Sequence, residues 1–381
     1  MNTFINFDEK YLYMAKKDKH FGFQYGFPLF TSQQSKSVSI KQDKIRISDI
    51  WSFWDYIIKV YGKRTNKAQG QFISSLLEQA KYFYVSAESA PLKSKPLLYY
   101  YSFLNLAKIV INLETQLGNT VEYNHGLKVD ITDTTNFLNA QIEIQQLGST
   151  SNKTGKTTLS VAKVFFDYLG DQIAYTPRTP YPLNIHKLFE SCIGIHRTFC
   201  ETYNKKEHFF RLDRISPQVK EQYVIKNGHD FIYDAFIDSC DDNTMQNLTS
   251  KGYNIHKDNK QYVLHEKISL GRRYNVTRSD WYRLSNSLLT KGLWTYTDGN
   301  EYRIYISSNA LPMTEASIIY CIMFFFGSIT RYHPYLFERI LSDKELWLVS
   351  EFLNTQPTQF LFYITSKVIG NYIYKSRHTR L

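Results

Sequence analysis

The chain has 381 residues, of which 43% are apolar and 16% aromatic, so it carries enough side-chain area to bury a large core, and global disorder is excluded. Its length exceeds the size at which a single core stops growing, which predicts two domains or one domain with a large insertion. The net charge of +11 favours nucleic acid or acidic proteins as partners, although spread basic residues also describe an ordinary solvated surface.

Two sequence features argue against export and membrane insertion. Polar and charged residues occur throughout the first 19 residues, which lack the apolar run of a secretory signal. The longest apolar stretch, 316–329, has 14 residues, too few to span a bilayer. The four cysteines contain no CxxC pair and fit neither a disulfide scaffold nor a zinc ribbon. We therefore expect a cytoplasmic protein with free thiols and no membrane contact.

The first half of the chain predicts an extended arm followed by three helices. Residues 1–47 show no sustained period and are interpreted as the arm. Ser48 and Asp49 supply N-cap chemistry for a helix that ends at Gly62, and apolar residues at helical spacing predict a second helix over 67–89. A third, over 96–118, is apolar on nearly all sides, as expected of a helix enclosed by others.

The remaining elements alternate between strand and helix signals. Period-two patterns at 140–145 and 159–161 predict two strands joined by the loop 148–156, and the Pro-rich stretch 176–184 predicts a boundary. A helix is expected over 185–203, and the turn at Asp298 and Gly299 predicts a hairpin. The last part predicts four helices, over 314–331, 334–341, 343–354 and 357–374.

These elements predict a mainly α protein with smaller β elements (α+β), built on a central helical bundle with a mixed insertion. Residues 1–47 would form an N-terminal arm, and 48–175 the first part of the helical core with a two-strand element. Residues 176–310 would form a mixed α/β insertion with a hairpin, and 311–381 the C-terminal helices that complete the core.

Three segments carry a family resemblance. The helix PLLYYYSFLNLAK at 96–108, HGL at 125–127 and RYHP at 331–334 occur in the order seen in the bacterial YaaC-like family, which this sequence resembles. That resemblance implies no established activity. It does imply a bacterial multi-gene setting, with antiviral defence genes as neighbours in some genomes, and hence a protein partner encoded nearby.

The helical pattern is also similar to HEPN domains, which include many ribonucleases. This likeness implies a site with an Arg followed four to six residues later by a His. No Arg in the chain has that spacing, so the sequence favours a HEPN-like scaffold without that nuclease site.

Polar residues inside the family-like segments are the candidate site. Asn105 and Lys108 share one face of an apolar helix, where an unpaired polar group costs about 1–3 kcal/mol. We hypothesise that Asn105, Lys108, His125, Arg331 and His333 form a pocket for a phosphate or carboxylate group. The alternative is structural: these residues cap helices and tie the two segments together.

Other motifs fall short of a site. Residues 155–157 resemble the end of a phosphate loop, but Thr150 stands where the first glycine is required. Cys192, His196 and Cys200 share a helix face, which we interpret as a buried face rather than a metal site. The acidic cluster at Asp238 is interpreted as a solvated turn. We expect no metal, no cofactor and no assigned catalytic residue.

Two functions remain open. The favoured one is a non-catalytic interaction or scaffold component that binds protein or nucleic acid, and its aromatic content also leaves a homo-oligomer open. The alternative is a nuclease or nucleotide-processing enzyme around Lys108, His125 and Arg331. An enzyme is the less favoured of the two because no general base with a metal or nucleophile can be assigned.

Overall fold

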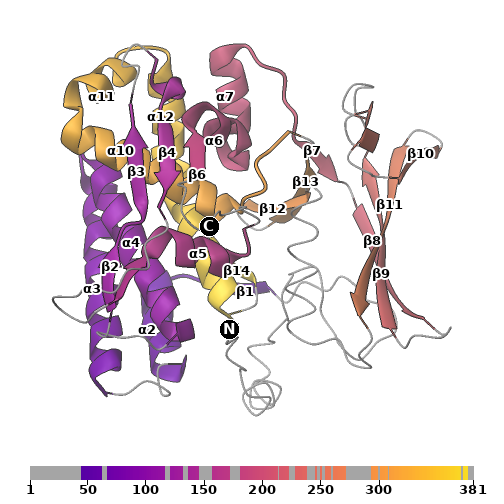
Figure 1. Cartoon of the computed structure of the whole chain (residues 1–381), viewed down its shortest axis with the longest axis horizontal. Helices are drawn as coiled ribbons and strands as arrows, with labels where there is room; N and C mark the ends of the chain where they lie inside the picture. The colour runs from indigo at the N-terminus through magenta and orange to yellow at the C-terminus, as the bar shows by residue number, and fades with distance from the viewer. Residues whose placement is uncertain are drawn as a thin grey trace, which may run out of the picture. The chain divides into compact units, whose positions relative to one another are not determined.

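The computed structural model of the chain describes residues 44–61, 67–115, 121–131, 136–145, 157–171, 181–212, 214–222, 228–237, 245–246, 249–250, 254–258, 261–271, 293–298, 301–307, 309–369 and 372–375. More of the described residues lie in helices than in strands, and the sheets are small, which confirms the predicted mainly α fold (Figure 1). The chain divides into two compact units. Residues 48–205 and 313–362 belong to the first unit, and the other described residues to the second.

The first unit contains most of the helices: α2 (Ile50–Tyr61), α3 (Lys67–Ser89), α4 (Lys95–Thr115), α5 (Val161–Leu169), α6 (Ile185–Ser191), α7 (His196–Tyr203), α10 (Glu315–Tyr332), α11 (Pro334–Leu341) and most of α12 (Glu345–Ile369). The predicted N-cap of α2 is confirmed, because the Asp49 carboxylate accepts hydrogen bonds from the backbone N–H groups of Trp51 and Ser52 at 3.0 and 3.2 Å. The helices predicted at α3, α4, α10 and α11 are confirmed within a few residues.

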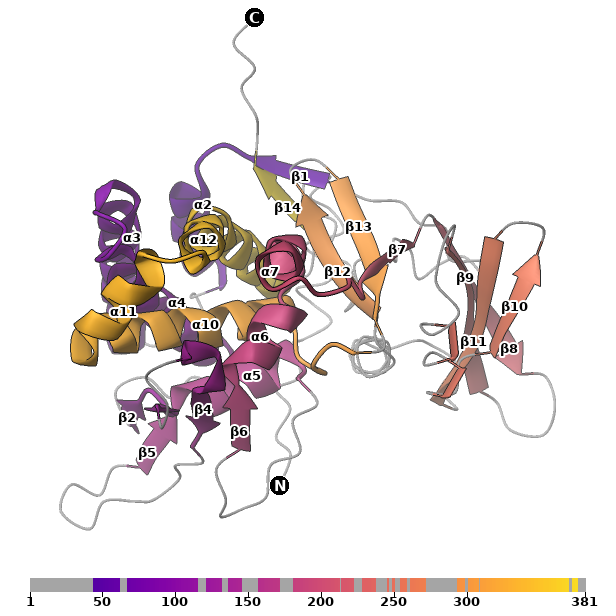
Figure 2. The same cartoon turned by 90° about the horizontal axis from the view of Figure 1, so that it is seen from above.

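Helix α4 lies at the centre of this unit. It packs along α3 and α10, and Figures 1 and 2 both show it beside these helices. Its Phe103 stacks on Phe360 of α12 with ring centroids 3.8 Å apart, and its Tyr100 contacts Phe324 of α10. Gly327 allows this approach, since an added Cβ would lie 3.3 Å from the Cβ of Tyr100. The family-like helix at 96–108 therefore packs against α10, which carries the start of the family-like segment 331–334.

Small sheets extend the first unit. Strand β4 (Gln141–Ile144) pairs antiparallel with β3 (Leu127–Asp130) and β6 (Tyr181–Asn184), while β2 (Val121–Asn124) pairs parallel with β5 (Thr157–Ser160). The prediction of a strand through residue 161 is wrong, because Val161 begins α5. The Ser160 hydroxyl caps that helix by accepting the N–H of Lys163 at 3.4 Å.

The second unit is mostly β. Strand β1 (Lys44–Ile47) pairs parallel with β14 (Tyr372–Lys375). A three-stranded sheet has the order β12 (Leu293–Asp298), β13 (Glu301–Ile306), β7 (Phe210–Leu212). A four-stranded sheet has the order β10 (Asn254–Asp258), β11 (Gln261–Gly271), β9 (Gly228–Ile237), β8 (Arg214–Gln222). The predicted hairpin is confirmed, with Asp298 paired to Glu301.

Helix predictions in two regions of the chain were wrong. The helices expected over 343–354 and 357–374 are one helix, α12, which continues through Pro357 and is followed by β14. Proline removes one helical hydrogen bond, and the full burial of Phe352 and Phe360 on either side offsets that loss. The helix expected over 185–203 is divided into α6, a short 3-10 turn at Ile193–Ile195 and α7.

Some predictions lie outside the described residues: most of the N-terminal arm, the loop 148–156, and Asp238 with its neighbours. In the described part of the chain, no helix is both long and apolar enough to cross a membrane.

Candidate anion-binding site

Three of the predicted site residues come from different elements of the first unit. Lys108 lies in the second half of α4, His125 follows β2, and Arg331 lies in the last turn of α10. Gly126, with a φ of +74°, turns the chain from β2 into β3 directly after His125. An added Cβ there would lie 2.0 Å from the Ser160 hydroxyl, so this corner requires glycine.

The structure brings both Lys108 and Arg331 within electrostatic range of His125. The pKa of His125 is lowered mainly by burial, and further by the positive charges of Lys108 and Arg331. Burial also lowers the pKa of Lys108. His125 is therefore a neutral imidazole at pH 7, with two cations in its vicinity.

A set of tyrosines frames this cluster. The hydroxyl of Tyr100 lies 2.7 Å from Nδ1 of His125, and burial raises the pKa of Tyr100 well above its ordinary value. The neighbouring Tyr101 hydroxyl accepts a hydrogen bond from Nη1 of Arg331 at 2.8 Å. The ammonium of Lys108 lies 5.8 Å from the ring centroid of Tyr123, a cation–π distance.

Sequence reasoning did not assign these tyrosines to the site. A signal was present: Tyr100 and Tyr101 belong to a run of three tyrosines in an otherwise apolar helix, and buried hydroxyl groups need hydrogen-bond partners. The partners come from residues that lie far away in the sequence, so the pairs themselves cannot be read from local spacing.

The cluster has an excess of positive charge. Within the part of the chain that the structure describes, no carboxylate forms an ion pair with Lys108 or Arg331. Two cations and a neutral imidazole provide N–H donors and no negative group, an arrangement suited to a phosphate or a carboxylate. The described residues contain no group of three or more His, Cys, Asp or Glu side chains placed to hold a metal ion.

The other two predicted residues have different surroundings. Asn105 is buried and its amide donates to Gln79 of α3 at 3.4 Å, so it contributes to the packing of α4 against α3. His333 is exposed and separates α10 from α11. Its backbone N–H donates to Ile329 and its carbonyl accepts from Phe337. These contacts fit the structural alternative for both residues.

The face formed by Cys192, His196 and Cys200 is buried. Both ring nitrogens of His196 have partners, Nδ1 at 2.7 Å from the carbonyl of Glu190 and Nε2 at 3.5 Å from the thiol of Cys200. Burial also raises the pKa of Cys192 well above its ordinary range, so this thiol is not a ready nucleophile.

A second buried polar group was missed by the sequence analysis. Glu315, in the first turn of α10, is 1% exposed and accepts backbone hydrogen bonds from Ile193 and Gly194 at 3.2 Å each. These bonds hold the short turn between α6 and α7, which explains why one continuous helix does not form there. Burial raises the pKa of Glu315 to about 7.

The family assignment agrees with the motifs described above. The model of the YaaC-like protein family matches residues 41–368, and the chain belongs to this family. The match includes the residues between 127 and 331, where none of the three family-like motifs lies. Searches of curated proteins and of solved structures each gave no match.

Proposed function

We propose that this protein is a non-catalytic binding component whose cluster of Lys108, His125 and Arg331 holds a phosphate group of a nucleic acid. The main support is the placement of two cations near His125 with no carboxylate paired to them in the described residues. A phosphate would supply the missing negative charge.

The physical chemistry of the cluster favours an anion. Burial lowers the pKa of both Lys108 and His125, and the positive charges of Lys108 and Arg331 lower the pKa of His125 further by repulsion, so the free site holds positive charge at a cost. A bound phosphate removes that repulsion and accepts several charge-assisted hydrogen bonds. The net charge of +11 also favours the approach of a polyanion.

The test measures the binding of fluorescein-labelled single-stranded and duplex oligonucleotides to the full chain. Fluorescence anisotropy at several salt concentrations gives the affinity. We expect Lys108→Ala and Arg331→Ala to weaken binding of both forms, and the slope of log affinity against log salt to fall by about one for each variant. Lys128→Ala is the matched control, because this lysine already pairs with Glu143 at 3.4 Å. Equal losses in all three variants, or none, would refute the proposal.

An enzyme remains the second candidate, and the Tyr100–His125 pair favours it. In the tautomer whose Nδ1–H donates to the Tyr100 hydroxyl, Nε2 of His125 is free to accept a proton from a substrate hydroxyl group. Its test is turnover of labelled RNA and of nucleoside triphosphates by the full chain. If the protein is an enzyme, His125→Gln abolishes turnover while oligonucleotide binding persists.

A protein partner encoded nearby belongs to the same proposal. Leu346 and Trp347 at the start of α12 are 43% and 52% exposed, an adjacent apolar pair that suits a protein contact. Co-expression with the flanking genes and a pull-down tests this, with Trp347→Ala expected to reduce recovery of the partner.

A further inference from the structure

The turn between α10 and α11 exposes an unusual run of side chains. All five residues from 331 to 335, with the sequence RYHPY, are exposed. Tyr332 is 65% exposed and Tyr335 is 87% exposed. Each tyrosine therefore presents an aromatic ring to solvent beside other hydrogen-bonding groups, although large aromatic side chains ordinarily contribute to burial.

This turn is joined to the anion-binding cluster through Arg331. The guanidinium carbon of Arg331 lies 4.8 Å from the ring centroid of Tyr332, while one of its N–H groups donates to Tyr101. The guanidinium has further N–H groups that can bind a phosphate. One face of the Tyr332 ring thus lies against a cation that also belongs to the proposed phosphate site.

The local charges do not oppose an anion. Glu338, in the next turn of α11, forms an ion pair with Lys93 at 2.8 Å, so its negative charge is offset. Arg339 follows it in the same helix. A polyanion that reaches Arg331 therefore meets exposed aromatic rings and no uncompensated carboxylate on α11.

From this arrangement we infer that the ligand is single-stranded nucleic acid, with bases stacked on Tyr332 and Tyr335 while a backbone phosphate lies at Arg331 and Lys108. The inference rests on the proposed function and narrows it. Phosphate binding alone does not involve the exposed rings of Tyr332 and Tyr335. The bases of a duplex are stacked on one another, so they cannot stack on these rings. A single strand offers phosphates and free base faces together, and aromatic platforms beside cations are how proteins bind it.

The experiment compares three labelled oligomers of about 12 units with the full chain: oligo-dT, oligo-rU, and an abasic oligomer with the same number of phosphates. We expect Tyr332→Ala and Tyr335→Ala each to weaken binding of the two base-bearing oligomers by about tenfold, with little change for the abasic one. Tyr82→Ala is the matched control, since Tyr82 is 61% exposed on α3 but donates its hydroxyl to Glu78.

The outcomes separate the two proposals. If Arg331→Ala weakens binding but both tyrosine variants bind like the wild type, or if the abasic oligomer binds as tightly as the others, the stacking inference is wrong and the phosphate site stands. Loss of binding in Tyr82→Ala to the same extent would also overturn it. If Lys108→Ala and Arg331→Ala leave all three oligomers unaffected, the proposed function fails as well.

Discussion

The hydroxyl group of Tyr100 lies 2.7 Å from Nδ1 of His125, which joins the central helix α4 to the residue between β2 and β3. The adjacent Tyr101 makes the corresponding bond to Arg331 of α10. Two consecutive tyrosines thus hold two residues of the candidate site. The first of these bonds is partly buried and the second lies at the surface.

This difference predicts unequal effects for two similar substitutions. Tyr100→Phe leaves a half-buried ring nitrogen without its partner, so we expect the free energy of unfolding to fall by about 1–2 kcal/mol. Tyr101→Phe removes a bond to an exposed guanidinium, and the loss should be about 0.5 kcal/mol or less. Urea unfolding of both variants measures the difference, and an equal loss would contradict the burial of the Tyr100 bond.

The charges around His125 predict the direction of a pKa change. Because Lys108 and Arg331 both lower the pKa of His125, Lys108→Gln and Arg331→Gln should each raise it toward the ordinary value of 6.5. Titration of the imidazole signals by NMR measures this shift. Lys128→Gln is the control and should leave His125 unchanged. If the pKa of His125 rises in neither site variant, Lys108 and Arg331 do not lie close to His125.

Glu315 predicts a loss of stability as the pH rises. Its pKa is raised from 4.5 to about 7 in the folded protein, mainly by burial, so between these values the folded state keeps a proton that the unfolded state has released. The stabilisation is complete below about pH 4.5 and is lost as the pH rises through 7.

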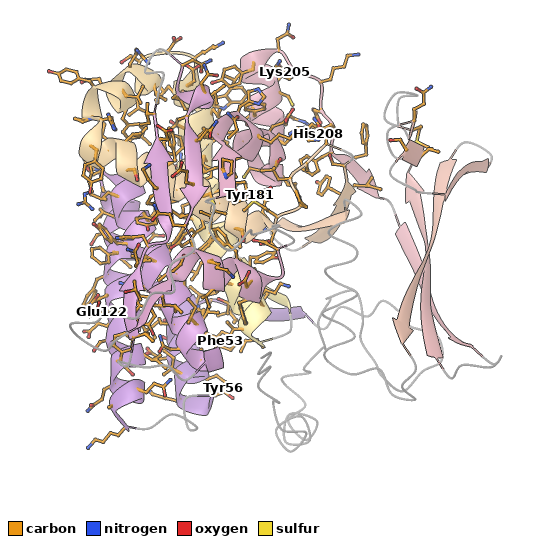
Figure 3. The ribbon with its side chains drawn as sticks, viewed as in Figure 1. Phe53, Tyr56, Glu122, Tyr181, Lys205 and His208 are labelled. Atoms are coloured by element: carbon orange, nitrogen blue, oxygen red, sulfur yellow. The ribbon has the colours of Figure 1, made fainter. Side chains whose placement is uncertain are left out.

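The substitution Glu315→Gln, which mimics the protonated acid, should flatten this part of the stability profile. Thermal unfolding between about pH 3.5 and 8.5, roughly one unit or more beyond the values of 4.5 and 7, measures the slope. Glu122, an exposed carboxylate on β2 labelled in Figure 3, is the control, and Glu122→Gln should keep the wild-type slope. If Glu315→Gln keeps the wild-type slope of stability against pH, the group that titrates is not Glu315.

Gly126, which turns the chain directly after His125, predicts that one added methyl group strongly lowers the free energy of unfolding. Gly126→Ala puts a side chain into the left-handed region and against the Ser160 hydroxyl, so a loss of about 2 kcal/mol or more is expected. Gly327→Ala is the comparison. Its Cβ would lie 3.3 Å from that of Tyr100 within a helix that favours alanine, so its effect should stay within about 1 kcal/mol. Similar unfolding midpoints for both variants would argue against a strained corner.

Much of the helical fold was predictable because its signals are local. Asp49 as a cap, the periodic apolar face of α3 and Pro334 at the start of α11 each act within a turn of helix, and the structure has helices at these places. Pro357 misled the prediction for the same reason. Its local effect is to end a helix, whereas the burial that keeps α12 continuous comes from other parts of the chain.

The site was predictable in its charges and not in its aromatic partners. Lys108 and Arg331 drew attention as charges within apolar segments, and the structure brings both near His125. Asn105 looked equivalent to Lys108 in sequence, yet it contacts α3, because a spacing of three residues fixes a helix face and not the partner that meets it. Glu315 gave no sequence signal beyond its position at the start of an apolar stretch.

The stacking of Phe103 on Phe360 has a consequence for the newly made chain. A ribosome releases α4 long before α12, with more than a hundred residues of the other unit made in between. Until α10 and α12 emerge, the apolar sides of α4 that they cover have no native neighbour. The growing polypeptide therefore exposes this apolar surface for much of its synthesis. Exposed apolar surface is what chaperones that protect nascent chains bind, so we expect the newly made chain to need them.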